Sequence, residues 1–157
     1  MKKHQDTLPI ITGFLDYLLD ERHFSPYTAR CYGVDLRQYV EHLADEHSIA
    51  IELANEASAW TRACTPQTDV VATVAPPTLT SIMLEADVAR IRGFLAHLNE
   101  SNYSAATMAR KIATLRSFHK WLEQRGVIAS NPMVLIRTPK QAKRLPKAIS
   151  VEDVERL

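Results

Sequence analysis

Glycine, aromatic residues and cysteine are all scarce in this sequence. Its 157 residues include 4 Gly and 2 Cys, and 7% of them are aromatic. This scarcity, together with long stretches rich in Ala, Leu, Arg and Glu, favours an α-helical fold. The composition is otherwise ordinary for a globular protein, with 46% hydrophobic and 24% charged residues. The length suits one domain, or one domain and the start of another.

Long apolar runs and targeting signals are also missing. No stretch approaches 18 apolar residues, and the chain does not open with a charged and then apolar leader. We therefore expect a cytoplasmic protein without a membrane partner. Cys31 and Cys64 have no paired metal-ligand spacing, so reduced structural cysteines are favoured over a disulfide or a redox pair.

Motifs that carry catalysis or hold cofactors are absent as well. The sequence has no G-x-x-x-x-G-K or G-x-G-x-x-G phosphate loop, no H-E-x-x-H and no nucleophile elbow around a serine. The histidines lack metal-ligand spacing. Adjacent carboxylates such as Asp45-Glu46 and Glu152-Asp153 fit a solvated surface or a first helical turn. We predict no catalytic residue, no metal site and no cofactor in this chain.

Positive charge is nearly balanced over the whole chain but gathers in its second half. Residues 1–81 hold 6 Lys and Arg against 11 Asp and Glu, whereas residues 82–157 hold 13 against 7. Within residues 102–147, Glu123 is the single acid among ten basic residues. A charge run often marks only a solvated face, but an excess this one-sided points to a polyanionic partner.

Hydrophobic periodicity predicts four main helices. They cover residues 8–21, 26–47, 82–100 and 104–126. Ser25 with Pro26 is the expected start of the second helix and Ser104 of the fourth, with Gly126 as the expected residue after its end. Asn131-Pro132 predicts a further short helical turn.

Residues 48–81 differ from the rest because they are rich in Thr, Ala and Pro and only weakly periodic. Residues 49–63 could form a short helix around Trp60. Residues 66–81 contain the Pro76-Pro77 pair, which opposes regular structure, so we expect a long exposed loop there.

The predicted helices form an internal repeat with a constant offset of 79 residues. The matched pairs are Ser25 and Ser104, Thr28 and Thr107, Leu36 and Leu115, Arg37 and Arg116, Tyr39 and Phe118, and Leu43 and Leu122. Each copy reads as a helix, a short loop and a Ser-capped helix, which is a helical hairpin. Any two capped amphipathic helices share some such residues, but the Leu-Arg match and the Ser/Thr spacing favour a true repeat. Two packed hairpins predict a compact four- to five-helix domain.

Two arginines occupy equivalent positions in the repeat, near the edge of each core stripe. Arg37 and Arg116 could each reach a phosphate, or could hold a carboxylate such as Asp35 or Asp87. The residues alone leave both interpretations open.

The helix predicted over residues 104–126 carries the most informative surface. On a helical wheel, its basic residues and small hydroxyls gather within about 120° of one another, opposite an apolar stripe. This basic face comprises Thr107, Arg110, Lys111, Thr114 and Ser117. Arg and Lys neutralise phosphates and Ser and Thr add short hydrogen bonds, so the face suits DNA; an ordinary solvated face is the alternative.

Further candidate DNA contacts lie at the two capped helix N-termini, which could receive phosphates, and in the basic segment that follows residue 136. The complete predicted set is Thr28, Arg30, Ser104, Thr107, Arg110, Lys111, Thr114, Ser117, Lys140, Lys143, Arg144 and Lys147.

Four pieces of sequence, in this order and spacing, resemble the N-terminal core-binding domain of Xer-type tyrosine recombinases, within the phage-integrase superfamily. They are S-x-x-T-x-x-x-Y-x-x-D-L from Ser25, L-R-S-F from Leu115, the pair Asn131-Pro132, and L-P-K followed by S-x-E-D-V-E-R-L. The chain departs from the family at residues 48–81, where family members have a shorter connection. The composition there favours a tolerated insertion over a protein or DNA contact.

The resemblance implies an all-α, SAM-like domain that forms half of a C-shaped clamp around duplex DNA. In this family a larger C-terminal domain holds an Arg/Lys/His/Arg set and the tyrosine nucleophile, so no tyrosine of this chain is assigned to catalysis. The resemblance also implies a tetrameric synapse with other recombinase protomers, and no cofactor.

The expected organisation is a core-binding domain over residues 1–136, a basic linker at 137–149 and the start of a catalytic domain at 150–157. Because the sequence stops one turn into a predicted helix, we expect that a C-terminal part is missing. The alternative function is a helical protein–protein adaptor whose basic face meets an acidic partner.

Overall fold

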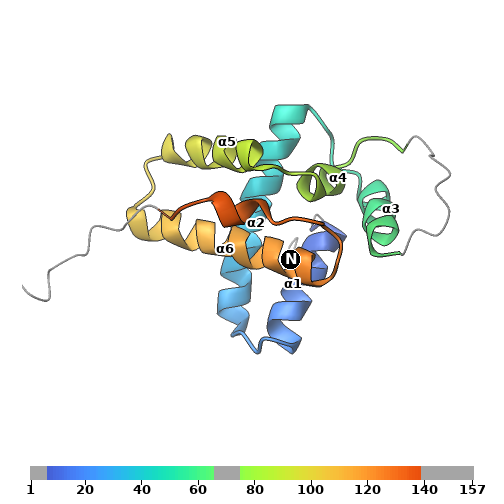
Figure 1. Cartoon of the computed structure of the whole chain (residues 1–157), viewed down its shortest axis with the longest axis horizontal. Coiled ribbons are helices and arrows are strands. Elements are labelled where there is room, and N and C mark those ends of the chain that lie inside the picture. Colours follow the sequence, from blue (N-terminus) through green and yellow to red (C-terminus); the bar gives the residue numbers. More distant parts are fainter. Residues whose placement is uncertain (1–6, 66–74, 139–157) are drawn as a thin grey trace, which may run out of the picture.

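Six α-helices and one 3-10 helix follow one another along residues 7–65 and 75–138, the part of the chain that the computed structural model describes (Figure 1). No strand occurs in those residues. The α-helices are α1 (Pro9–Asp20), α2 (Pro26–His47), α3 (Leu53–Cys64), α4 (Leu79–Leu84), α5 (Val88–Asn99) and α6 (Ala105–Gln124), and the 3-10 helix is η1 (Pro132–Leu135). The predicted all-α fold is confirmed.

The two long helices α2 and α6 begin with the same cap, as the repeat predicts. The Ser25 hydroxyl accepts from the Thr28 backbone N–H at 3.1 Å, and the Ser104 hydroxyl accepts from the Thr107 N–H at 3.2 Å. In both caps the serine and threonine hydroxyls also bond each other, at 2.9 and 3.0 Å. Gly126 follows α6 with a φ of 72°, the left-handed conformation expected after a helix end.

The single helix predicted over residues 82–100 is wrong in its extent, because the structure divides it. α4 starts earlier, at Leu79, and ends at Leu84, whereas α5 starts at Val88. The break follows from a cap inside the predicted helix: the Asp87 carboxylate accepts from the Arg90 backbone N–H at 2.8 Å and so starts a new helix.

The described residues between α2 and α5 contain more regular structure than their composition indicates. The short helix considered at residues 49–63 is present as α3. The exposed loop predicted for residues 66–81 is wrong at its end, because Thr78, Leu79 and Thr80 are buried. Residues 66–74 lie outside the described part of the chain.

A buried carboxylate accounts for this order. The Glu56 side chain of α3 accepts from the backbone N–H groups of Leu79 and Thr80, both at 2.8 Å, and from the Thr80 hydroxyl at 2.5 Å. These N–H groups belong to the first turn of α4, where helical donors lack partners within the helix. Glu56 therefore caps α4 from another helix and joins the two.

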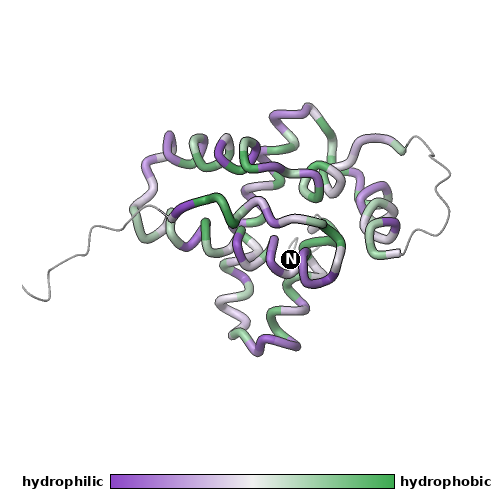
Figure 2. Tube along the Cα trace, viewed as in Figure 1, coloured by the Kyte–Doolittle hydropathy of each residue, from purple (hydrophilic) through white to green (hydrophobic). Residues whose placement is uncertain are grey.

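The two hairpins cross where α6 passes over the middle of α2 (Figure 1). α1 packs along α2 in the first hairpin, and α5 and α6 run in opposite directions in the second. η1 packs against both α5 and α6, and α3 packs against α1 and α4. Hydrophobic residues recur along each helix between hydrophilic ones (Figure 2), as amphipathic helices around a shared core require.

Aromatic rings from three helices meet in the core. The Phe14 ring centroid on α1 lies 5.4 Å from that of Phe118 and 5.5 Å from that of Trp121, both on α6. Trp60 of α3 stacks on Trp121 with ring centroids 5.6 Å apart. Each such pair adds about 0.5–1.5 kcal/mol beyond the burial of its area. α3 is thus attached to α6 by Trp60 and to α4 by Glu56.

Replacing the buried cap should destabilise the domain. We expect Glu56→Ala to lower the free energy of unfolding by about 2–4 kcal/mol, because the α4 donors would stay buried without an acceptor. Urea denaturation followed by circular dichroism measures the change. The matched control is Glu52→Ala, which removes an exposed carboxylate four residues earlier and should change stability by less than about 0.5 kcal/mol. Equal effects of the two variants would contradict the assigned role of Glu56.

Acidification should also destabilise the fold, because His119 is buried. The side chain is 1% exposed, and its Nδ1 lies 2.9 Å from the Leu115 carbonyl oxygen. Burial lowers the pKa of His119 below its ordinary value of 6.5. The pKa of His42 is also lowered, mainly by burial and to a smaller extent by the nearby His97. As the pH falls below 6.5, the unfolded chain therefore binds more protons than the folded domain does. The free energy of unfolding decreases over the same range.

Urea denaturation at about pH 7.5 and about pH 5.5 measures this loss within each variant. We expect His119→Gln to show a smaller loss than the unsubstituted protein, with the remainder due to His42. A pH dependence unchanged by His119→Gln would contradict the assignment.

Candidate nucleic-acid interface

A buried carboxylate lies where α2 and α6 cross. The Asp35 side chain is 3% exposed and accepts hydrogen bonds from three residues of α6. Arg110 donates through Nε at 3.2 Å and Nη2 at 2.9 Å, Lys111 through Nζ at 3.0 Å, and Thr114 through its hydroxyl at 2.8 Å. A desolvated carboxylate is tolerated when it is paired and fully hydrogen-bonded, and these donors meet that requirement.

The network continues from Asp35 through Lys111. The Lys111 ammonium also donates to Gln38 Oε1 at 2.7 Å and lies 5.0 Å from the centroid of the Tyr103 ring. Gln38 Nε2 in turn donates to the Tyr103 hydroxyl at 2.8 Å. Lys111 therefore directs its charge inward, between the two helices.

The prediction that Lys111 and Thr114 lie on an exposed basic face is wrong. Lys111 is 5% exposed and Thr114 is 0% exposed. The helical wheel assumed one buried side, whereas α6 is buried on two sides, against the apolar core and against α2. The physical reason is Asp35, whose buried oxygens need donors, and both residues turn toward it.

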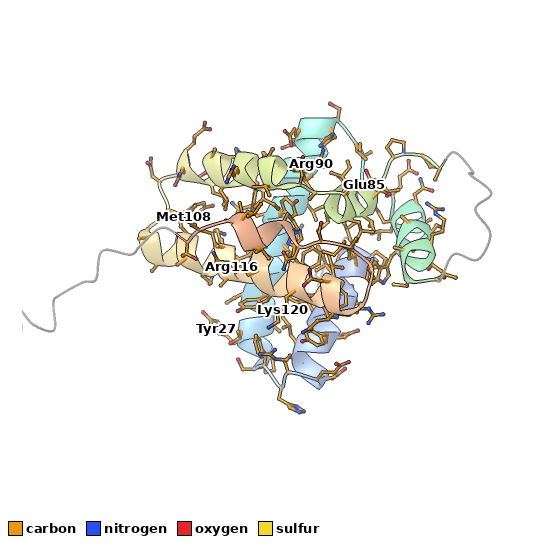
Figure 3. All side chains as sticks on the ribbon, in the orientation of Figure 1. Tyr27, Glu85, Arg90, Met108, Arg116 and Lys120 are labelled. Carbon is orange, nitrogen blue, oxygen red and sulfur yellow. The ribbon has the colours of Figure 1, made fainter. Side chains whose placement is uncertain are left out.

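Arg110 reaches the surface from the same network. Its side chain is 45% exposed although two of its nitrogens bond Asp35. The hydrogen bonds to Asp35 raise the pKa of Arg110, burial lowers it, and Cys31 and Tyr27 add smaller electrostatic contributions. In Figure 3, Tyr27 marks the start of α2 and Met108 the start of α6.

The other predicted contacts within the described residues lie on the same two helices. Arg30 and Ser104 are exposed, whereas Thr28, Thr107 and Ser117 are half-buried. Four predicted contacts lie outside the described part of the chain; they are Lys140, Lys143, Arg144 and Lys147. The contact that the structure makes between the two helices is therefore that of Arg110, Lys111 and Thr114 with Asp35.

Arg37 and Arg116 make different contacts despite their equivalent positions in the repeat. Arg116 donates to the Ile136 carbonyl oxygen at 2.6 Å and to the Thr138 hydroxyl, and it fastens the chain that follows η1 onto α6 (Figure 3). Arg37 forms an exposed ion pair with Glu41 at 3.3 Å on its own helix. The two arginines therefore occupy equivalent positions in the repeat but bond different partners.

Sequence reasoning missed the central role of Asp35 and the contacts of Gln38 and Tyr103. It offered Asp35 as a partner for Arg37 or Arg116, whereas the residues that bond this carboxylate are Arg110, Lys111 and Thr114. One signal could have identified the contact. Asp35 and Thr114 stand at equivalent positions of the repeat, 79 residues apart, each directly before a core leucine. Polar residues at such positions suggest a bond between the two copies.

The described residues supply fixed positive charge and hydrogen-bond donors at the helix crossing, which suits the binding of an anion. Within residues 7–65 and 75–138, no group of three His, Cys, Asp or Glu side chains could hold a metal ion. No helix in these ranges is long and apolar enough to cross a membrane.

Comparison with known proteins identifies a family that matches more than half of the chain. The chain matches the family described as "Phage integrase, N-terminal SAM-like domain" over residues 11–64 and 73–126. The match includes most of the Thr-, Ala- and Pro-rich region at residues 48–81. Residues 65–72 lie between the two matched parts and are not matched.

Curated relatives are tyrosine recombinases. XerD of Listeria monocytogenes serotype 4b (strain F2365) is 32% identical over 148 residues, which is 94% of this chain and 39% of that protein. XerC of Syntrophus aciditrophicus (strain SB) is 30% identical over 145 residues, 92% of this chain and 39% of the relative. XerC of Myxococcus xanthus is 27% identical over 146 residues, 93% of this chain and 38% of the relative.

The chain spans about two fifths of the length of these relatives. No solved structure is significantly similar to it. The family match covers well over half of the sequence, and it includes all but the first residues of the four predicted helices that form the repeat. The chain therefore belongs to the N-terminal SAM-like domain family of the phage integrases and tyrosine recombinases.

Proposed function

We propose that this domain binds duplex DNA for a site-specific tyrosine recombinase, holding the recombination site while another part of the protein cleaves and rejoins the strands. The observation that carries the proposal is Arg110, a half-exposed guanidinium fixed at the crossing of α2 and α6. The similarity to the XerD and XerC tyrosine recombinases supports the same conclusion.

The charges around the crossing favour a polyanion. Arg110 and Lys111 both pair with the single carboxylate of Asp35, so the crossing keeps a net positive charge. The N-termini of α2 and α6 add their helix dipoles, and a helix N-terminus attracts phosphates through its free N–H groups. Phosphate contacts of this kind position a protein on DNA without reading its sequence.

The same proposal assigns roles to residues 137–157 and to the rest of the recombinase. The relatives extend well beyond the matched region, and we place the strand-cleaving chemistry in that remainder. Residues 137–149 would form a basic linker, with Lys140, Lys143, Arg144 and Lys147 as further phosphate contacts, and residues 150–157 would begin the catalytic domain. The whole protein would act on duplex DNA together with other recombinase protomers, in a tetrameric synapse and without a cofactor.

A DNA titration tests the proposal. Fluorescence anisotropy with a labelled duplex of mixed sequence should show binding at about 50 mM salt that weakens roughly tenfold or more at about 200 mM, because phosphate contacts release counterions. Arg30→Ala combined with Arg110→Ala should weaken binding about tenfold or more at the lower salt concentration. Lys111 is left unchanged because it is buried, whereas Arg110 is exposed at the surface.

The matched control removes the same charge elsewhere. Arg62→Ala combined with Arg92→Ala takes two exposed arginines from α3 and α5 and should change affinity far less. Circular dichroism establishes that each variant is folded. Absence of binding at low salt, or binding that salt does not weaken, would refute the DNA proposal and favour an adaptor that recognises an acidic protein.

A further inference from the structure

Asp35 and Arg110 form one ion pair, but only the arginine is exposed at the surface. The Asp35 side chain is 3% exposed, whereas its partner Arg110 is 45% exposed. The carboxylate takes the Nε and Nη2 groups of the guanidinium, at 3.2 and 2.9 Å. A guanidinium has five N–H donors in a rigid plane, so one edge bonds the carboxylate while the opposite edge keeps donors for another anion.

We infer that Asp35 is a positioning residue for DNA binding, which holds the Arg110 guanidinium so that its free edge meets a backbone phosphate. The inference rests on the proposed function and adds to it the residue that prepares the contact. The buried carboxylate restrains a flexible side chain in one orientation before the phosphate arrives. Less of its rotational freedom is then lost on binding.

The opposite role, in which Asp35 competes with DNA for Arg110, agrees less well with the contacts. Lys111 and Thr114 also bond this carboxylate and are themselves buried, so Asp35 stays in place whether or not a phosphate is present. The Thr114 hydroxyl, which donates to Asp35, also lies 3.1 Å from the Arg110 backbone carbonyl oxygen on its own helix. The two roles predict opposite signs for one substitution.

That substitution is Asp35→Asn, studied with the same labelled duplex at several salt concentrations. Removal of a negative charge near a phosphate would by itself strengthen binding. If Asp35 positions Arg110, affinity instead falls about tenfold, and the slope of log affinity against log salt is reduced by about 0.9, the loss of one phosphate contact. Binding as tight as that of the unsubstituted protein, or tighter, would overturn the inference.

Glu41→Gln is the matched control on the same helix. It removes one exposed negative charge that pairs with Arg37 and does not belong to the Asp35 network. Its affinity should equal or slightly exceed that of the unsubstituted protein, with an unchanged salt slope. A loss as large as that of Asp35→Asn would show that any carboxylate of α2 has this effect, and the inference would fail.

A second variant decides the question if Asp35→Asn does not fold. Arg110→Lys keeps the positive charge but replaces the planar fork with a single ammonium, which cannot bond both carboxylate oxygens through separate nitrogens and still present a free edge. We expect it to bind about as weakly as Arg110→Ala. Affinity close to the original would mean that charge alone suffices and would overturn the inference.

The experiment also separates this inference from the function beneath it. If the unsubstituted protein shows no salt-dependent DNA binding, the proposed function fails and the positioning role fails with it. If that protein binds and Arg110→Ala weakens binding, while Asp35→Asn and Arg110→Lys do not, only the positioning role is wrong.

Discussion

The buried carboxylate of Asp35 is the contact on which the arrangement of the two hairpins depends. Helices α2 and α6 cross at this point, where apolar side chains of both helices also join the core. Asp35 adds a constraint on their register, because a desolvated carboxylate is tolerated only where donors reach both of its oxygens. Arg110, Lys111 and Thr114 reach them in one register of α6 on α2. The same contact leaves Arg110 half exposed at the surface, so the element that specifies the packing also prepares the candidate binding group.

A second buried carboxylate performs a related task at the other side of the domain. Glu56 of α3 caps the first turn of α4 and is 1% exposed, so two helices distant in the sequence share one set of hydrogen bonds. In both cases the acid satisfies groups on another element rather than on its own helix. Trp60 then stacks on Trp121 and seals α3 against the core of the hairpins. The described residues of the Thr-, Ala- and Pro-rich region at 48–81 therefore pack as part of the domain.

Much of the fold could be predicted from local patterns. Ser25 and Ser104 mark helix starts because their hydroxyls bond a backbone N–H three residues away, and Gly126 marks a helix end because it accepts a positive φ. Such signals act within one turn of chain. The division of residues 82–100 shows the limit, because hydrophobic periodicity continues through a break that the Asp87 cap creates. Periodicity reports which side of a helix is apolar and is less informative about where one helix stops.

The sequence by itself determined the helical composition of the domain, the caps, the repeat and the excess of positive charge after residue 101. Only the tertiary structure decided which of those charges stay at the surface. Lys111 and Thr114 lie on the basic side of the helical wheel, yet both are buried, because α6 is covered by α2 on that side and Asp35 requires their donors. A carboxylate 75 residues away from Arg110 in the chain is invisible to any local pattern. Burial and pairing of charge depend on which helices meet, and that is a property of the folded domain.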